Sequence, residues 1–519
     1  MSHNTALDAS LTLIKALIAA QGCELIETHI SWVLLTGQYA YKIKKPVNFG
    51  FLDFSTLEKR CFCCHEELRL NQRFAADLYL EVVPITGTPM HPDLDGTGSA
   101  IEYAVKMRRF PAGQLLRTAA ERHELSRDDI DQLAELIADF HQTVEQADEN
   151  SVYGDSANIN HWFVENFAHI RPLLIDDAAK QQLQAIEQWG ANEWQQQAEL
   201  MALRKCQGQV RECHGDLHLG NMTRLNGRVT LFDCIEFNPL LRWIDVISEV
   251  AFLFIDLLYF GYDSHAYRLL NRYLHHTADY QGLALLRYYL AYRALVRAKV
   301  SLLRMAQQVD DAVLSQQARG DYVIFANLAE RFTRRRQTAL IITHGYSGSG
   351  KSTLAAQLAE QIGAFQIRSD IERKRLFGYT ALTETGSVID SQIYSPEASL
   401  ATYQHLHELA KTVLDAGFPV IVDATFLKID QREPFRQLAA DSGVPFHILS
   451  FQASDQTLCS RIKQRQNDAS EATVAVLRHQ QQSAQALSAQ EQAVTFEINT
   501  EIGNALEKML GRFGESANG

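Results

Sequence analysis

One eight-residue run in this chain of 519 residues has the glycine, lysine and serine spacing of a phosphate-binding loop. It reads Gly345-Tyr346-Ser347-Gly348-Ser349-Gly350-Lys351-Ser352 and fits G-x-x-x-x-G-K-[ST] at every fixed position. An apolar run precedes it and an amphipathic stretch follows, so we expect a strand, then the loop, then a helix. Glycines let backbone N–H groups face phosphate oxygens, and the helix start adds a positive dipole end. We predict a nucleotide site formed by this loop and Thr353, with Lys351 on the β and γ phosphates and Ser352 on Mg²⁺.

A second set of polar residues lies in the stretch 212–233. Asp216 is followed five positions later by Asn221, which is the spacing of a kinase catalytic loop. Asp233 ends the next short apolar run, and Asn226-Gly227 predicts a tight hairpin turn that returns Asp233 to the side of Asn221. We expect Asp216 to accept or orient the proton of an acceptor hydroxyl, and Asn221 and Asp233 to bind Mg²⁺.

A lysine and a glutamate nearer the N-terminus could anchor the α and β phosphates of the same nucleotide. Lys42 and Lys44 lie on one face of a predicted strand, and Glu66 and Glu67 lie on the helical segment that follows. The spacing leaves open which lysine and which glutamate form the pair. No G-x-G-x-x-G run precedes them, so the loop that would cover the phosphates is not identified.

The C-terminal region offers two carboxylates near the ends of predicted strands. Asp423 ends an apolar run and is expected to bind Mg²⁺ directly or through water. Asp370 follows another apolar run, where an open α/β sheet binds its ligands, so we predict it as the base for a substrate hydroxyl. Arg368 or Arg373 could bind an anion there. The alternative for Asp370 is a helix N-cap.

Two arginines four positions apart, Arg461 and Arg465, are expected on one face of a helix, followed by a polar loop. Such an arginine pair could close over the transferred phosphoryl group and stabilise its charge, so we count both among the catalytic candidates. The alternative is a surface helix with solvated arginines.

Around these residues the sequence predicts an α+β, two-lobed, kinase-like domain followed by an α/β domain. The first domain is expected over residues 1–335, with a strand-rich small lobe at about 1–110 and a helical lobe at about 111–335. In residues 338–519 apolar runs alternate with helical stretches, which indicates a mainly parallel sheet with crossover helices.

The run HGDLHLGN followed by LFDCIEF resembles the signature of the aminoglycoside phosphotransferase-like kinases. The resemblance spans about residues 25–330 and implies Asp216 as catalytic base, Asn221 and Asp233 as metal ligands, and His214 as a support of the loop. The stretches AYKIKKPVNFGFLDFSTLEKR and EELRLNQR are similar to the variant of this family that is fused to a C-terminal P-loop kinase. This likeness implies Lys42 as the phosphate lysine, with Lys44 as the alternative, and Glu67 as its helix partner. Asp245 resembles the acid that braces the loop in this family, although a plain helix N-cap is equally consistent with its position.

The C-terminal runs SDxxRKRL, VDATFL and RxxxRxxDAS resemble the P-loop kinases that include gluconate kinase, polynucleotide kinase and zeta-toxin-like enzymes. This resemblance spans the whole C-terminal domain. It implies ATP as the phosphoryl donor, and it leaves the acceptor open because these enzymes act on sugars, nucleic-acid ends and sugar nucleotides.

The composition of the chain argues against extended nucleic-acid binding and against membrane partners. The net charge is −13 and neither domain is basic, which argues against extended nucleic-acid binding. No run reaches 18 apolar residues, the N-terminus lacks a signal-peptide layout, and the eight cysteines form no paired framework, so we expect a cytoplasmic protein without a membrane segment. The oligomeric state stays open.

The leading hypothesis is a bifunctional phosphotransferase that moves the γ-phosphoryl of ATP to hydroxyl acceptors at two Mg–ATP sites. A regulatory protein, in which one domain binds nucleotide to control the other, is the first alternative. A kinase for nucleic-acid 5′ ends, acting through the C-terminal domain, is the second.

Overall fold

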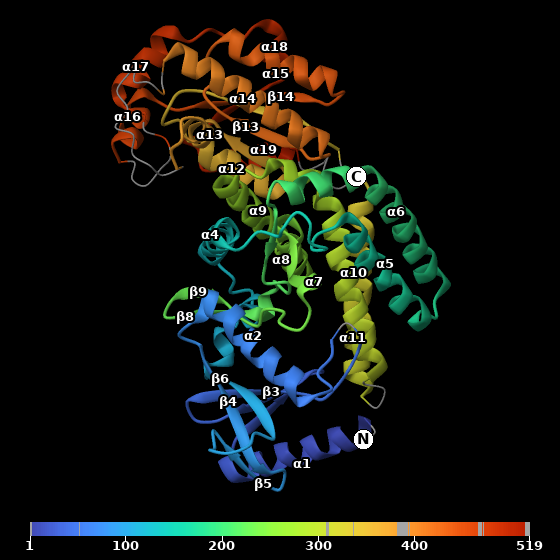
Figure 1. Ribbon diagram of the computed structural model, residues 1–519. Coiled ribbons are helices and arrows are strands. Elements are labelled where there is room, and N and C mark those ends of the chain that lie inside the picture. Colours follow the sequence, from blue (N-terminus) through green and yellow to red (C-terminus); the bar gives the residue numbers. More distant parts are fainter. Residues whose placement is uncertain are drawn as a thin grey trace. The chain divides into compact units, whose positions relative to one another are not determined.

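The computed structural model describes residues 3–50, 52–307, 311–335, 337–380, 393, 395–464, 470 and 472–513 (Figure 1). The chain forms two compact units. The first comprises residues 1–132, 143–162 and 198–256, and the second comprises residues 133–142, 163–197 and 257–519. The kinase-like loop therefore belongs to the first unit, and the phosphate-binding loop belongs to the second.

The first unit begins with a six-stranded sheet in the order β1-β2-β3-β6-β4-β5, with every neighbouring pair antiparallel. Trp32 and Leu34 of β2 and Ile43 of β3 bury one face of this sheet against Leu17 of helix α1. The elements are α1 (His3–Gln21), β1 (Glu24–Glu27), β2 (Ser31–Leu35), β3 (Tyr39–Lys44), α2 (Leu57–Ala75), β4 (Tyr79–Thr88), β5 (His91–Leu94) and β6 (Glu102–Arg108).

Helix α2 carries the predicted glutamates. Its N-cap Thr56 accepts a hydrogen bond from the backbone N–H of Lys59, which satisfies one of the free donors at the helix start. Cys64 and Leu70 are fully buried on the inward face of α2, and Glu67 lies between them and is equally buried. A carboxylate in such a place needs a cationic partner.

The predicted hairpin is present in the first unit. Asn226 and Gly227 have φ values of 52° and 78°, as the two central residues of a type I′ turn require, and they join β8 to β9. The neighbouring elements are α3 (Leu116–Glu121), β7 (Val210–Glu212), β8 (Met222–Leu225), β9 (Arg228–Leu231), α7 (Pro239–Arg242) and β10 (Trp243–Asp245).

Long helices dominate the middle of the chain. Tyr288 and Tyr289 are buried, and Tyr288 stacks on Phe163 with 4.8 Å between the ring centroids. The helices are α4 (Arg127–Thr143), α5 (Ser156–Ile170), α6 (Asp177–Cys206), α8 (Val246–Tyr259), α9 (Asp263–Thr277), α10 (Leu283–Gln307) and α11 (Ala312–Thr333).

The C-terminal part of the second unit is a parallel five-stranded sheet in the order β12-β13-β11-β14-β15, with helices around it (Figure 1). Its buried centre includes Ile341, Ile421 and Leu449. The strands are β11 (Leu340–His344), β12 (Phe365–Arg368), β13 (Val420–Asp423), β14 (Phe446–Gln452) and β15 (Thr495–Asn499), and the helices are α12 (Lys351–Ile362), α13 (Ser369–Leu376), α14 (Pro396–Asp415), α15 (Ile429–Asp441), α16 (Asp455–Gln464), α17 (Val474–Ser483), α18 (Ala489–Ala493) and α19 (Ala505–Phe513). The predicted fold class is confirmed for both parts of the chain.

Candidate active sites

The predicted catalytic loop of the first unit brings Asp216, Asn221 and Asp233 together. The side-chain amide of Asn221 donates to the backbone oxygen and to a carboxylate oxygen of Asp216, both at 3.0 Å. Phe232 donates its backbone N–H to the backbone oxygen of Asn221 at 3.0 Å, which places the end of the β8–β9 hairpin beside the loop. Asp233 follows with a left-handed φ of 65°, a conformation that non-glycine residues rarely adopt away from functional sites.

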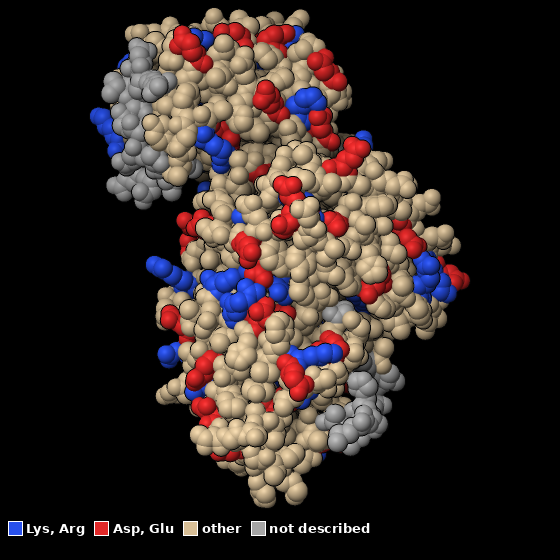
Figure 2. All heavy atoms as spheres, in the orientation of Figure 1, with Lys and Arg blue, Asp and Glu red and all other residues tan. Residues whose placement is uncertain are grey.

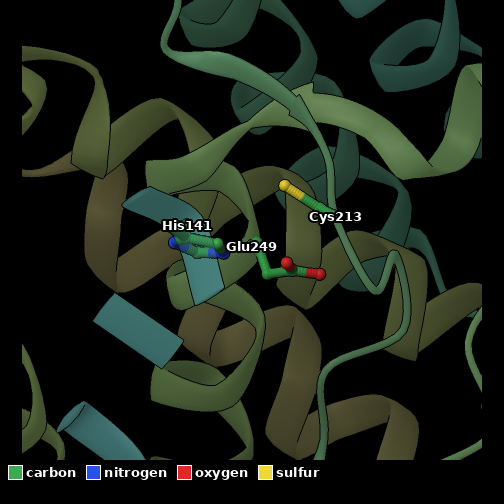
Figure 3. A group of neighbouring side chains, drawn as sticks. All are labelled: His141, Cys213 and Glu249. Atoms are coloured by element: carbon green, nitrogen blue, oxygen red, sulfur yellow. The ribbon is translucent and has the colours of Figure 1, made fainter. Parts of the chain in front are cut away.

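Two carboxylates of helix α8 hold this loop by its backbone. Glu249 accepts hydrogen bonds from the N–H groups of His214 (3.0 Å) and Gly215 (2.7 Å), and Asp256 accepts one from Leu219 (2.9 Å). Figure 3 shows the Glu249 side chain near Cys213, at the end of the strand that enters the loop. Because these groups are buried, the catalytic loop is fixed before any ligand arrives.

Gly215 and His214 support the loop in other ways. Gly215 has φ 89°, and a Cβ there would lie 3.0 Å from the backbone oxygen of Leu241, so a side chain would be strained. Nε2 of His214 lies 2.8 Å from the backbone oxygen of Phe232 and ties the loop to the hairpin. Asp245 pairs with Arg204 of helix α6 and accepts the backbone N–H of Ile247 at the start of helix α8, so it connects these two helices.

The two candidate lysines of β3 share one glutamate of helix α2. Nζ of Lys42 lies 2.8 Å from one carboxylate oxygen of Glu67, and Nζ of Lys44 lies 2.7 Å from the other. Lys42 also pairs with Asp233, and Lys44 pairs with Glu236. The favoured pair Lys42–Glu67 is therefore formed, but Lys44 belongs to the same network rather than being a substitute for Lys42.

Burial and charge set the ionisation of this network. The side chains of Lys44 and Glu67 are 0% exposed. Burial alone would raise the pKa of Glu67, but Lys42 and Lys44 outweigh it and hold that pKa at about 2. Burial likewise favours the neutral form of Lys42, and Asp233 and Glu67 overcome this effect so that its pKa is raised. Glu67, Lys42 and Lys44 are therefore charged at neutral pH.

Glu66 contacts arginines, whereas Glu67 contacts the lysines of β3. It pairs with Arg69 at 2.9 Å and with Arg242 at 3.3 Å, and Arg69 also pairs with Glu212 at 2.7 Å. These contacts connect helix α2 to the segments on either side of the catalytic loop. Glu66 is therefore held away from the lysines of β3.

The phosphate-binding loop of the second unit has the backbone that its glycines permit. Gly345, Gly348 and Gly350 have φ values of 140°, 83° and 86°. A Cβ would lie 2.6 Å from the backbone oxygen of Phe451 at Gly345, and 2.8 Å from that of Leu458 at Gly348. Side chains at these positions would therefore collide with the neighbouring backbone, whereas glycines allow the conformation in which loop N–H groups can face a phosphate.

Lys351 and the magnesium candidates converge at this loop. Nζ of Lys351 lies 2.7 Å from the backbone oxygen of Tyr346 and 3.5 Å from Oγ of Ser349. The side chain of Ser352 hydrogen-bonds with Asp423, and the hydroxyl of Thr343 lies 3.4 Å from the same carboxylate. Burial raises the pKa of Asp423, although the nearby charges of Arg368 and Lys351 favour its ionised form.

The acceptor candidates lie at the carboxyl end of β12. Arg368 donates to both carboxylate oxygens of Asp370 at 3.1 and 2.7 Å, and this arginine holds the pKa of Asp370 low despite its burial. Asp370 lies in the first turn of α13, so the predicted base is also a helix-start residue. Arg373 donates to the backbone oxygen of Ile393 at 3.0 Å.

Only one of the two predicted lid arginines can be placed. Arg461 lies on α16 and donates to the hydroxyl of Thr500 at 2.8 Å and to the backbone oxygen of Gly348 at 3.5 Å, so it contacts the phosphate-binding loop itself. Arg465 lies outside the described residues, as does most of the polar loop that follows it.

Both donor sets fit Mg²⁺ and ATP. Carboxylate, amide and hydroxyl oxygens are the ligands that Mg²⁺ prefers, and a lysine beside them is the usual partner of the nucleotide phosphates. Asn221 and Asp233 would hold the ion in the first unit, and Ser352 and Asp423 would hold it in the second. The structural observation that supports the nucleotide fit is a loop backbone that only glycine permits at Gly345 and Gly348, followed directly by the start of helix α12.

Two residues of these sites, Glu236 and Gln366, were not found from the sequence. Glu236 and Lys44 pair at the base of the first site, and the only sequence signal is the position of Glu236 three residues after Asp233. Gln366 on β12 donates to Asp423 at 3.0 Å, but in the sequence it is one polar residue within an apolar run.

The surface and the helices add two observations. On the face shown in Figure 2, basic and acidic side chains are interspersed. Among the helices that the structure describes, none is both long and apolar enough to cross a membrane.

Comparison with known proteins assigns both parts of the chain to families. The phosphotransferase enzyme family model matches residues 64–286, and an AAA domain model matches residues 340–487. Among solved structures, an amicoumacin kinase in complex with AMP-PNP and Ca²⁺ is 14% identical, covers 63% of this chain and 95% of its own, and gives a TM-score of 0.41. A gluconokinase from Sinorhizobium meliloti is 19% identical, covers 35% of this chain and 95% of its own, and gives a TM-score of 0.27.

The relatives cover most of the chain. An uncharacterized protein of Mycobacterium tuberculosis and one of Mycobacterium bovis are each 31% identical over 450 residues, which is 87% of this chain and 88% of the relative. The two domain families identify the chain as an ATP-dependent kinase with ATP and Mg²⁺ as cofactors. The chain, in which an aminoglycoside phosphotransferase-like domain precedes a P-loop kinase domain, therefore belongs to the same family as these mycobacterial proteins.

Proposed function

We propose that the chain is a bifunctional phosphotransferase that transfers the γ-phosphoryl group of ATP to hydroxyl groups of small molecules at two separate Mg–ATP sites in the cytoplasm. One observation supports this proposal: each compact unit brings together a lysine, oxygen donors of the kind that bind Mg²⁺, and a further carboxylate that we assign as the base. A unit that had become purely regulatory would not need to keep a base next to its metal ligands.

In the first unit, Asp216 is the group that would take the proton of the acceptor hydroxyl. Its position is fixed by Asn221, whose amide donates to Asp216 and whose amide oxygen would serve the metal together with Asp233. Lys42 would anchor the phosphates while Glu67 holds it in place. The metal, when bound, offsets the charge that develops on the transferred phosphoryl group.

In the second unit, Asp370 would orient the acceptor hydroxyl, and Lys351 would neutralise the β and γ phosphates. Arg368 keeps Asp370 ionised. Asp370 would therefore position the acceptor hydroxyl and receive the proton of that hydroxyl late in the transfer. Arg461, which contacts the phosphate-binding loop, would stabilise the charge of the transferred group.

The number of nucleotides bound tests this proposal. Isothermal titration of the full chain with Mg²⁺ and a non-hydrolysable ATP analogue is expected to give two sites per chain. Lys351→Ala should leave one site, because its ammonium group is expected to contact the β and γ phosphates. Lys411→Ala, an exposed lysine of the same unit that pairs only with Asp415 among the described residues, is the matched control and should leave two. One site in the wild type would contradict the proposal.

A further inference from the structure

Helix α9 covers the edge of the P-loop sheet with side chains that act as a neighbouring strand would. Strand β12 is the edge strand of its sheet among the described residues, so its outer backbone groups pair with no described strand. The side-chain amide of Asn271 on α9 donates to the backbone oxygen of Ala364 at 3.0 Å, and its oxygen accepts the backbone N–H of Gln366 at 2.7 Å. One asparagine thereby pairs with the C=O and the N–H on either side of Phe365, along the outer edge of β12.

Two further contacts fasten α9 to the same region. Nε2 of His275 lies 2.9 Å from the backbone oxygen of Gln366, and burial lowers the pKa of His275 to about 3. The ring is therefore neutral at physiological pH, with Nε2 as the protonated nitrogen that donates to this oxygen. Arg268 pairs at 2.8 Å with Glu360, a buried residue of the helix that begins at Lys351.

The side chain of Gln366 carries this arrangement into the nucleotide site. Its Nε2 donates to a carboxylate oxygen of Asp423 at 3.0 Å and lies 3.2 Å from the backbone oxygen of Ser352. Gln366 is 2% exposed and Asp423 is 4% exposed, so water does not compete for these contacts. One amide thus contacts both residues that are expected to hold Mg²⁺.

We propose that Asn271 and Gln366 are positioning residues for the magnesium site of the P-loop domain, and that helix α9 is a structural part of that site. The proposal rests on the function proposed above for Ser352 and Asp423. Asn271 belongs to the part of the chain that matches the phosphotransferase family, whereas Gln366 belongs to the part that matches the AAA domain. The P-loop site therefore depends on a helix outside its own domain family.

The chemistry of metal sites gives the size of the effect. A ligating carboxylate is oriented by hydrogen bonds from residues that do not themselves touch the metal, and loss of such a partner typically weakens metal binding by about 10- to 100-fold. Removal of the Gln366 amide frees one oxygen of Asp423 to rotate. Removal of the Asn271 amide lets β12 and Gln366 shift, so its effect should be in the same direction and smaller.

The test uses the full chain and a fluorescent ATP analogue, with Mg²⁺ titrated at fixed nucleotide. Only the part of the signal that Lys351→Ala abolishes is assigned to the P-loop site. In Gln366→Met the Mg²⁺ concentration for half-maximal binding should rise by about tenfold, and in Asn271→Leu it should rise by a smaller factor. Gln437→Met and His276→Ala, which change exposed residues of the same domain and of the same helix, should leave it unchanged.

Milder variants guard against misfolding. Gln366→Asn keeps the side-chain amide on a shorter side chain. Asn271→Asp still accepts the backbone N–H of Gln366 but cannot donate to the backbone oxygen of Ala364. Hydrogen exchange of the 364–368 segment should become faster in both Asn271 variants, because their hydrogen bonds to β12 are lost or weakened. Thermal unfolding without nucleotide shows whether each variant is folded.

The outcomes separate the two proposals. If Lys351→Ala leaves nucleotide binding intact, the proposed P-loop function fails. If Lys351→Ala removes binding but the folded Gln366 variants keep the wild-type Mg²⁺ dependence, the positioning role of Gln366 is overturned. If only the Asn271 variants behave like wild type in both Mg²⁺ dependence and exchange, helix α9 is not part of the site.

Discussion

At the scale of single residues, the first site is organised by a buried network of two lysines and three acids. Lys42 and Lys44 both contact Glu67, and each has a second acid, Asp233 or Glu236, after the β8–β9 hairpin. Through these lysines of strand β3, Glu67 connects helix α2 to the segment that follows the β8–β9 hairpin. Because Lys42, Lys44, Glu67 and Glu236 are buried, each of these four depends on the others for its charge.

We predict strong coupling between Lys44 and Glu236. Lys44→Met leaves Glu236 buried without its cation and should destabilise the chain by about 3–5 kcal/mol. Glu236→Gln should restore part of this loss in the double variant, because no unpaired charge then remains at that position. Urea unfolding of the two single variants and the double variant measures the coupling.

The exposed pair Lys59–Asp53 provides the matched control for that measurement. Lys59 is 48% exposed, so Lys59→Met should change the free energy of unfolding by less than about 1 kcal/mol. Additive effects of Lys44→Met and Glu236→Gln would show that the two residues do not depend on each other.

The network also predicts how stability varies with pH. Glu67 has a pKa of about 2 in the folded chain and a higher, ordinary value when unfolded, so the unfolded chain binds more protons between these two values. The stabilisation from Glu67 is therefore complete above pH 4.5 and is lost as the pH falls toward 2, with a slope of about 1.4 kcal/mol per pH unit. Glu67→Gln should flatten the acid limb of a plot of unfolding free energy against pH. An unchanged slope would show that Glu67 is not held ionised by the two lysines.

At the scale of elements, the sequence predicted those parts whose signals are local. The Asn226-Gly227 turn, the phosphate-binding loop and the alternation of apolar runs with helices each depend on neighbouring residues, and the structure has the hairpin and the parallel sheet. Contacts between distant segments carry no such signal. Lys44 and Glu236 are 192 positions apart, and Gln366 contacts a side chain 95 positions earlier, so neither partner could be identified from spacing.

Helix α8 gives a prediction at this scale. Glu249 holds the catalytic loop through the N–H groups of His214 and Gly215, so Glu249→Ala should free the loop and reduce Asp216-dependent phosphoryl transfer by at least tenfold, or about 1.4 kcal/mol in the barrier. Nucleotide binding at the P-loop site should not change. Glu199→Ala, an exposed acid on helix α6, is the control for a change of charge alone. Full transfer activity in Glu249→Ala would rule out this role for α8.

At the scale of the whole molecule, the question is whether two sites on one chain act separately. The compact units do not coincide with the two family matches, because the second unit contains both the P-loop sheet and the helices α9 to α11. The predicted boundary between residues 335 and 338 follows the two sequence patterns, whereas the compact units divide the chain at other positions. Structural dependence of the P-loop site on α9 is compatible with separate catalysis.

The most direct measurement of the central claim uses γ-labelled ATP and a metabolite extract. The full chain, Asp216→Asn, Lys351→Ala and the double variant are incubated in parallel, and labelled products are separated. The account predicts that each single variant loses a different product and that the double variant loses both, so that the products themselves identify the acceptors. Loss of all labelling in either single variant would contradict two independent transferases and favour control of one domain by the other.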